Sequence, residues 1–384
     1  MTRKAIGIVG GGVGGIAAGI ALLQAGFTVR IFEKAGQLRE AGAGVSLWPN
    51  GTVILSELGV LPGILKHGQV GTHFLLRAQS GELLMNISTT RADTPTVCLH
   101  RADLLRVLAQ AMPRECFSLN HEVTGVESNG QKVFLQFRNQ ESFVCDGVVG
   151  ADGVHSRLRA LLGDGRRPSP RGYVIFRGLA DTPTDLPLGH NGESWGAGHR
   201  FGTLAIGKNK VCWYATANTS VLDQPAEKRK ERLQEIFQAW HDPIPQLIAT
   251  TEPSTIMVAN ACDLGPFRHG PGAMTLLGDA AHALTPNLGQ GACTALEDAL
   301  VLAKCLSGHS SVSSGFRRYE SLRFPRVRSA VLRSRWLGAI GQWESRVAVS
   351  LRNLVTRRLP PHLFECHATY AEHLAMLTGR CLKV

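Results

Sequence analysis

Three things that this sequence lacks exclude several classes of protein. It has no run of about 18 uncharged apolar residues, so no segment has to cross a membrane. Its nine cysteines are scattered and include no Cys-x-x-Cys pair, which argues against both a metal centre and a disulfide framework. Acidic residues are scarce between Arg317 and Arg358, where only two accompany eleven arginines. We therefore expect reduced thiols, no bound metal and a cytoplasmic protein.

Most of the net charge of +11 lies near the C-terminal end, because residues 317–358 alone contribute +9 (eleven arginines minus two acids). No nucleic-acid-reading module accompanies these arginines, so we expect no nucleic-acid partner. Within Arg333–Arg358 apolar side chains recur at helical spacing, namely Trp336, Ile340, Trp343, Val347, Leu351 and Leu354. We favour packing of this stripe against the core, and peripheral membrane contact is the alternative. We expect the protein to be either a monomer or a homodimer.

The N-terminal segment shares the charge pattern of a secretory signal, because Arg3 and Lys4 precede an apolar, glycine-rich run. That run nevertheless has the order of a nucleotide-binding unit. Residues 5–9 predict a buried strand, the glycines at 10–15 predict a turn, and apolar residues at helical spacing follow as far as Gly26. A second apolar run, Thr28–Phe32, completes a strand–turn–helix–strand unit. We therefore expect the segment to stay part of the folded protein.

The spacing of the first glycines, at 10, 12 and 15, is the Gly-x-Gly-x-x-Gly pattern of dinucleotide-binding turns. Glycine lets the backbone approach a pyrophosphate closely, and the helix that starts near Val13 points its free N–H groups at the phosphates. Glu33 is placed to accept hydrogen bonds from the ribose hydroxyls of an adenosine. Its charge would repel the 2′-phosphate of NADP, which argues against NADP as the ligand of this unit.

Two further Gly/Asp motifs follow apolar runs later in the chain. Asp152-Gly153 comes after a strand predicted at Phe143–Val149, and its aspartate either caps a helix or takes part in cofactor binding. Gly278-Asp279, after a short strand predicted at Met274–Leu277, is open to the same two interpretations. Pro286 and then Gly289-Gln290-Gly291 lead into a long helix, whose N-terminus would stabilise negative charge on a reduced flavin ring.

The alternation of these segments predicts an α/β fold. We expect a Rossmann-type FAD-binding domain with a parallel sheet, interleaved with a mostly antiparallel β-sheet substrate domain, plus C-terminal helices interrupted at Pro325. The first domain is predicted to comprise residues 1–70, 98–172 and 265–310, the second residues 71–97 and 173–264, and the helical segment residues 311–384.

Taken together, the three motifs resemble those of the single-component FAD-dependent aromatic hydroxylases, which have the fold of p-hydroxybenzoate hydroxylase. The resemblance extends to about Pro361 and is nearest the salicylate/urate hydroxylase and zeaxanthin epoxidase branch. It implies bound FAD, with Asp279 on the ribityl chain, Asp152 near the pyrophosphate, Arg101 near the ribose and phosphate, and Val123 against adenine. The residues expected to contact FAD are Gly10, Gly12, Val13, Gly14, Gly15, Glu33, Lys34, Ser46, Arg101, Val123, Asp152, Asp279, Gly289, Gln290, Gly291 and Ala292.

The same resemblance implies a monooxygenase that uses NAD(P)H and O₂. NAD(P)H would dock transiently and reduce FAD, and a flavin C4a-hydroperoxide would then hydroxylate or epoxidise an aromatic, heteroaromatic or polyene molecule. Arg200 aligns with a substrate-binding arginine of the urate branch, although an exposed strand arginine is the alternative. Pro286 is expected to line the reactive face of the flavin. A flavin-dependent reductase of an unsaturated isoprenoid and a non-catalytic FAD-binding partner protein remain as other functions.

Overall fold

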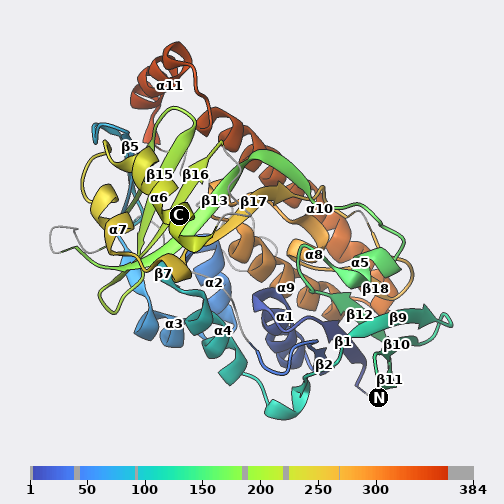
Figure 1. Ribbon diagram of the computed structural model, residues 1–384. Helices are drawn as coiled ribbons and strands as arrows, with labels where there is room; N and C mark the ends of the chain where they lie inside the picture. Colours follow the sequence, from blue (N-terminus) through green and yellow to red (C-terminus); the bar gives the residue numbers. More distant parts are fainter. Residues whose placement is uncertain are drawn as a thin grey trace.

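The computed structural model describes residues 3–38, 44–90, 94–183, 189–218, 225–267 and 269–361. In Figure 1 a parallel sheet lies at the lower right with the N-terminus, and a larger sheet lies at the upper left. The long helix α10 (Val312–Gly341) runs diagonally along both parts. The predicted fold class, α/β with one parallel and one mostly antiparallel sheet followed by helices, is confirmed.

The parallel sheet consists of short apolar runs, as expected for strands covered on both faces. One face packs against α1 (Val13–Gln24) and α9 (Gly291–Ser307). The other packs against a small antiparallel sheet of β9 (Val123–Ser128), β10 (Val133–Phe137) and β11 (Gln140–Cys145). In spatial order, the five parallel strands are β18 (Met274–Leu276), β12 (Gly147–Gly150), β1 (Ala5–Val9), β2 (Thr28–Phe32) and β8 (Phe117–Ser118).

The single strand predicted at Phe143–Val149 is wrong, because the chain turns at Asp146 and changes sheets there. The Asp146 carboxylate accepts a hydrogen bond from the backbone N–H of Ala5 at 2.7 Å, and the Asp146 N–H donates to the Ala5 carbonyl oxygen at 2.8 Å. These two bonds join the turn to the start of β1. The apolar run alone therefore does not reveal that it serves two sheets.

The larger sheet is antiparallel except where β14 (His190–Trp195) pairs with β5 (His73–Ala78) in parallel. Helices α6 (Ala226–Phe237) and α7 (Ile244–Thr250) cover one of its faces, where Phe237 and Leu247 pack in one cluster with Trp213. Because side chains alternate along a strand, the polar side chains of Arg200 and Tyr214 lie on the opposite face. Its strands, in spatial order, are β17 (Met257–Asp263), β13 (Ser169–Asp181), β16 (Lys210–Ala217), β15 (His199–Ala205), β14 (His190–Trp195), β5 (His73–Ala78) and β6 (Leu83–Ser88).

A three-stranded antiparallel sheet connects the two parts, because β3 (Gly44–Leu47) and β7 (Thr96–His100) contact β15 and β3 also contacts α9. Its third strand is β4 (Gln69–Gly71). The remaining short helices are α2 (Pro49–Glu57), α3 (Leu61–His67), α4 (Arg101–Gln110), η1 (Arg114–Cys116), α5 (Arg157–Leu161), η2 (Pro253–Thr255), α8 (Asp279–His282) and η3 (Pro286–Leu288).

The C-terminal helices differ from the prediction in two ways. Helix α10 continues through Pro325, so the expected interruption is wrong. Proline has no N–H to donate to the carbonyl oxygen of Ser321, but both residues lie on the exposed side of the helix, where water can bond that oxygen. The predicted apolar stripe does not lie on a single helix. Helix α10 ends at Gly341, and the rest of the stripe lies on a separate helix, α11 (Arg346–Arg358). Core packing is wrong for Trp336 and Val347, which are 68% and 79% exposed. None of the described helices combines the length and apolarity needed to cross a bilayer.

Candidate functional site

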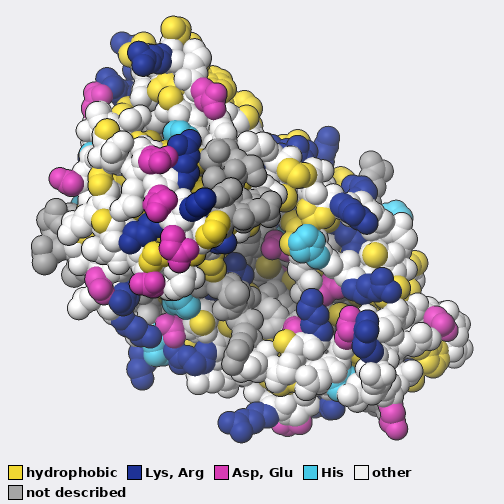
Figure 2. Space-filling model, in the orientation of Figure 1, with side chains coloured by type: hydrophobic (Ala, Val, Ile, Leu, Met, Phe, Trp, Pro, Cys, Tyr) yellow, Lys and Arg dark blue, Asp and Glu magenta, His cyan; other side chains and the backbone are white. Residues whose placement is uncertain are grey.

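Four neighbouring strands of the parallel sheet end at the same edge, and each is followed by a residue expected to bind FAD. Gly10 follows β1, Glu33 follows β2, Asp152 follows β12 and Asp279 follows β18. In open α/β sheets, ligands bind in the crevice outside the carboxyl ends of the strands. The fold thus brings three motifs that are far apart in the sequence to one place, and Figure 2 shows the surface hollowed between the two large sheets.

The glycine turn after β1 leaves no room for side chains. At Gly10 the backbone is left-handed (φ +110°), and a Cβ there would lie 2.4 Å from the carbonyl oxygen of Ala151. A Cβ on Gly15 would lie 2.0 Å from the carbonyl oxygen of Gly10. The turn, α1 and the chain after β12 can therefore pack together only when both positions are glycine.

Two helices at this edge begin without a side-chain cap. Gly12, which precedes α1, has no side chain to bond the first amides, and the side chain of Gln290 does not bond the first amides of α9. Those N–H groups stay free for a ligand, and aligned peptide dipoles place roughly half a positive charge at each N-terminus. A Cβ on Gly291 would meet no other atom within 4 Å. This arrangement fits FAD, which carries a pyrophosphate and a ring that becomes anionic on reduction.

Glu33 lies beside the glycine turn. Its carboxylate accepts hydrogen bonds from the backbone N–H groups of Gly11 at 2.8 Å and Ala35 at 3.0 Å. These bonds fix the position of the carboxylate, which keeps lone pairs for a ribose hydroxyl. The neighbouring side chain of Lys34 is exposed.

Asp152 is engaged by its own helix. Its carboxylate accepts hydrogen bonds from the Ser156 hydroxyl at 2.5 Å and from the backbone N–H groups of Arg157 and Leu158 at 2.7 and 3.0 Å. Asp152 therefore caps the start of α5, one of the two roles that its sequence context allowed. Its backbone still adjoins the glycine turn, because the Ala151 N–H donates to the Val9 carbonyl oxygen at 2.7 Å.

Asp279 and Arg101 approach each other from different parts of the chain. Burial raises the pKa of the Asp279 carboxyl, and His282 and Arg101 act in the opposite direction. Asp279 lies deep among protein atoms yet keeps accessible surface, so a ligand can reach it. The residue before it, Gly278, has the left-handed φ of +60° that this turn requires. The charge of Arg101 thus acts on the carboxyl of the third motif, although the two residues are far apart in the sequence.

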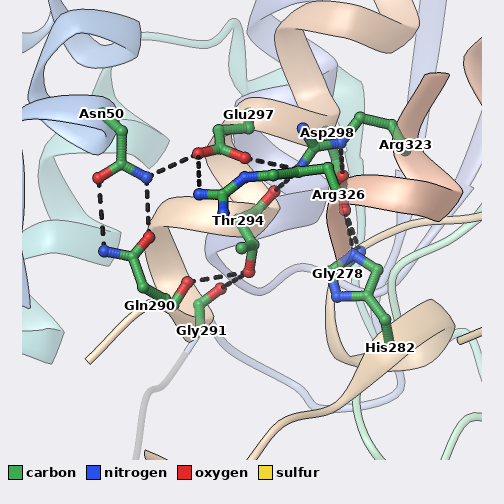
Figure 3. Close-up of polar contacts among 10 residues, drawn as sticks. All are labelled: Asn50, Gly278, His282, Gln290, Gly291, Thr294, Glu297, Asp298, Arg323 and Arg326. Atoms are coloured by element: carbon green, nitrogen blue, oxygen red, sulfur yellow. Dashed lines mark hydrogen bonds and ion pairs between the residues drawn. The ribbon is translucent and has the colours of Figure 1, made fainter. Parts of the chain in front are cut away.

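A buried ionic network holds this third turn, and sequence analysis missed it. Figure 3 shows Asp298 of α9 between the turn and α10: it accepts from the Gly278 N–H at 2.9 Å and contacts Nε2 of His282 at 2.5 Å. Its other oxygen accepts from Nε of Arg323 at 2.5 Å, and Arg323 also binds Glu297 at 2.7 Å. Both acids are fully buried. Two adjacent acids in the middle of the mostly apolar helix 291–307 are the sequence signal for such a network.

The same network reaches the loop before α9. Asn50 donates to the side-chain oxygen of Gln290 at 2.8 Å and to Glu297 at 2.6 Å (Figure 3). Gly289 has a left-handed φ of +61°, and a Cβ there would lie 2.9 Å from Nε1 of Trp48. The segment containing Trp48 and Asn50 therefore packs against the loop that is expected to border the flavin.

The pKa of Asp298 gives this network a pH dependence. Burial alone would raise that pKa, but His282, Arg323 and the Gly278 amide together lower it to about 2, from 3.8 for the unfolded chain. The carboxylate therefore adds about 2 kcal/mol of stability above pH 4, and this contribution is lost as the pH falls toward 2. We expect urea unfolding to show the wild-type advantage over Asp298→Asn shrinking by about 1 kcal/mol between pH 6 and pH 3. Parallel pH profiles of the two proteins would contradict this.

Arg200, predicted on the substrate side, is buried rather than exposed on its strand, with 2% of its side chain accessible. Its guanidinium lies 3.1 Å from a carboxylate oxygen of Glu193 and donates to the side-chain oxygens of Asn287 at 2.5 Å and Gln342 at 3.0 Å. Asn287 follows Pro286 in η3, so Arg200 joins the larger sheet to the loop before α9. Burial, followed by the charge of Glu193, raises the pKa of nearby Tyr214 well above its ordinary value.

The remaining predicted residues occupy different environments. Pro286 is exposed at the start of η3, and Ala292 is half-buried in the first turn of α9. The Ser46 hydroxyl lies 3.6 Å from Sγ of Cys98, in the sheet that connects the two parts. Val123 is 4% exposed and packs in a cluster with Phe32, so its side chain belongs to the core.

Comparison with known proteins agrees with this geometry. Residues 3–334 match the family described as FAD binding domain. The chain is 38% identical to the aurachin C monooxygenase/isomerase of Stigmatella aurantiaca, over 92% of this chain and 93% of that protein. It is 30% identical to the FAD-dependent urate hydroxylase of Klebsiella pneumoniae, over 86% and 88%. The crystal structure of Klebsiella pneumoniae HpxO with FAD and uric acid superposes with a TM-score of 0.89 at 27% identity, over 95% and 96%.

The chain therefore belongs to the FAD binding domain family, and it is an FAD-dependent monooxygenase. The predicted cofactor, FAD, is confirmed by the family and by the structures that contain it. NAD(P)H is the co-substrate, as is usual for this family.

Proposed function

We propose that this monooxygenase adds an oxygen atom to an aromatic, heteroaromatic or polyene small molecule that binds between η3 and the larger sheet. The single observation that carries the proposal is the hydrogen bond from Arg200 to Asn287. It joins the polar face of the sheet to the loop that enters α9, and that loop is where we expect the flavin ring. Hydroxylation of urate by a relative of the same fold supports this class of substrate.

We propose that the residues at the edge of the parallel sheet hold FAD. The uncapped amides after Gly12 receive the pyrophosphate, Glu33 accepts from the adenosine ribose, and Asp279 accepts from the ribityl hydroxyls. The N-terminus of α9 lies against the ring and favours its anionic form. FAD supplies the electron transfer and oxygen activation, and the protein orients the substrate and excludes water from it.

The charge of Arg200 on the substrate side is balanced by a neighbouring acid. Arg200 is matched by Glu193, and both are buried, with 2% and 6% of their side chains accessible. A substrate that meets this face does not have to bring a negative charge to neutralise Arg200. We therefore propose that Arg200 and Pro286 shape the pocket, and that Arg200, together with Tyr173, holds the Asn287 side chain and thereby η3 in place beside the substrate.

Replacement of Arg200 tests this role. Arg200→Gln should keep FAD bound with unchanged affinity but lower the fraction of NAD(P)H oxidation that yields oxygenated product by about tenfold, because the Asn287 side-chain oxygen loses one of its two donors and η3 is held less firmly. Product per NAD(P)H consumed, measured by chromatography alongside absorbance at 340 nm, reports this ratio. Arg138→Gln, which changes an exposed ion pair with Glu122, is the matched control. Equal product yields from Arg200→Gln and Arg138→Gln would refute the role.

The function itself is tested by purifying the protein with FAD and screening phenolic, heteroaromatic and polyene compounds. A substrate should accelerate NAD(P)H oxidation and should take up ¹⁸O from ¹⁸O₂. A saturated product formed without O₂ would instead indicate the reductase, and NAD(P)H oxidation that no compound accelerates would favour the non-catalytic partner.

We also propose that the protein is cytoplasmic and is a monomer or a homodimer. The domain boundaries predicted from the sequence stay part of this proposal, as does a membrane contact within Arg333–Arg358.

A further inference from the structure

Helix α11 has its polar side toward the protein. Arg352 and Thr356 are 4% and 6% exposed, and Arg352 donates to the carbonyl oxygens of Gly196 at 3.2 Å and Gly341 at 3.3 Å. Its guanidinium also lies 5.1 Å from the centre of the Trp195 ring. A helix on the surface of a globular protein normally turns its apolar stripe toward the core. In α11 the inward contacts are polar.

The outward side of α11 is apolar. Val347 and Leu351 are 79% and 56% exposed, and they continue into Leu354 and Val355 at 43% and 46%. Seven of the eleven exposed large apolar side chains in the described ranges lie within residues 332–355. Figure 2 shows yellow apolar side chains beside dark blue basic ones at the top of the molecule, where Figure 1 places α11. An apolar cluster of this kind marks an interaction surface.

The charges around this face identify its partner. Helix α11 contains no acid, and Arg346 and Arg358 are exposed at its two ends. Arg333, on the last turns of α10, is exposed as well. Two acids beside this helix have partners of their own: Glu82 pairs with Arg357, and Glu344, two residues before α11, accepts a hydrogen bond from Asn218. Apolar and tryptophan side chains between exposed arginines suit the interface of an anionic bilayer.

Two identical faces of this kind repel each other, because each presents arginines to the other. A symmetric dimer through α11 would bring the exposed Arg346 and Arg358 of both copies into one apolar contact. Anionic lipid headgroups satisfy the same arginines and leave the apolar side chains free to enter the acyl region.

We propose that the outward face of α11, together with Trp336 and Trp343, docks this enzyme peripherally on anionic lipid surfaces. The helix lies in the plane of the interface, with Val347, Leu351 and Leu354 inserted and Arg346 and Arg358 at the headgroups. This contact is separate from the oxygenation chemistry, and it places the whole molecule at a surface where apolar substrates dissolve.

Co-sedimentation of the FAD-loaded, full-length protein with lipid vesicles tests the proposal. We expect binding to vesicles of phosphatidylglycerol and phosphatidylcholine at low salt, and little binding to phosphatidylcholine alone. Arg346→Gln with Arg358→Gln should weaken the first by about 25-fold, since each arginine near an anionic surface contributes about fivefold. Val347→Ser with Leu351→Ser should weaken it by about tenfold.

The control pair is Leu65→Ser with Val144→Ser, which removes exposed apolar side chains elsewhere and should bind vesicles as the wild type does. FAD content and NAD(P)H oxidation should be unchanged in all three double variants, so failure of docking is distinguishable from failure of the proposed oxygenation. Quenching of Trp336 and Trp343 fluorescence by brominated lipid should accompany binding.

Three results would overturn the proposal. The first is the absence of binding to anionic vesicles at low salt. The second is equal binding by the wild type and by Val347→Ser with Leu351→Ser. The third is a lipid-independent dimer, seen by analytical ultracentrifugation, that these two substitutions dissolve; this would assign the face to a second copy of the chain.

Discussion

Arg323→Leu is expected to lower the free energy of unfolding by about 3 to 5 kcal/mol, the largest effect of any single substitution considered for this protein. Arg323 is 4% exposed and is the cation that lies between Glu297 and Asp298, both of which are fully buried. Leucine fills much of the space but leaves two adjacent carboxylates in a low-dielectric environment. Arg326, at 3.3 Å from Glu297, and His282, at 2.5 Å from Asp298, remain in contact with them, but the cation that the two carboxylates share is lost, which loosens the Gly278 turn.

Equilibrium unfolding in urea measures this loss, with Arg138→Leu as the matched control. Arg138 is 64% exposed and pairs with Glu122 at 2.8 Å, so the same substitution there should change stability by less than about 1 kcal/mol. Adding Asp298→Asn to Arg323→Leu should recover part of the loss, because one of the two charges is removed. A loss below about 1 kcal/mol for Arg323→Leu would show that the network is not stabilising.

Gly15→Ala should weaken FAD binding by about 100-fold, equivalent to about 2.7 kcal/mol. The new methyl group would lie 2.0 Å from the carbonyl oxygen of Gly10 and 3.3 Å from Cβ of Ala151. Backbone atoms cannot rotate away as a flexible side chain can, so the turn has to separate from α1. This moves the amides that we expect to bind the pyrophosphate.

Quenching of FAD fluorescence on titration with apoprotein reports the dissociation constant. Gly165→Ala is the control, because a Cβ at Gly165 would meet no other atom within 4 Å and its φ is not positive. Circular dichroism of the Gly15→Ala apoprotein separates weak binding from failure to fold. A folded variant whose dissociation constant is within threefold of the wild type would contradict the close packing of the turn.

Much of the fold could be predicted from the sequence because the relevant signals are local. The strand at residues 5–9, the glycine turn and the strand at 28–32 depend on apolar runs and on backbone freedom, and both can be recognised without knowing the fold. The prediction was wrong at Asp146, where one apolar run serves two sheets, and at Pro325, where a helix tolerates proline on its exposed side. In each case, tertiary contacts or solvent exposure supplied the hydrogen bonds that local rules count as lost.

Part of the candidate site could likewise be predicted from local sequence signals, and part could not. The positions of Gly10, Glu33 and Asp279 at one sheet edge were anticipated, because their motifs each follow a strand. The partners of Arg200, and the pairing of Asp298 with Arg323 across 25 residues of chain, were not. Hydrogen bonds between distant polar side chains leave no periodic pattern in the sequence.

By itself, the sequence determined the class of the protein, its cofactor and the order of its nucleotide-binding motifs, since these depend on residue type and short-range spacing. Only the tertiary structure decided that Asp298 pairs with His282 and Arg323, that Arg200 is neutralised by Glu193, and that α11 turns its apolar side outward. The physical reason is that burial and pairing are properties of a packed arrangement, in which each side chain meets partners far away in the chain.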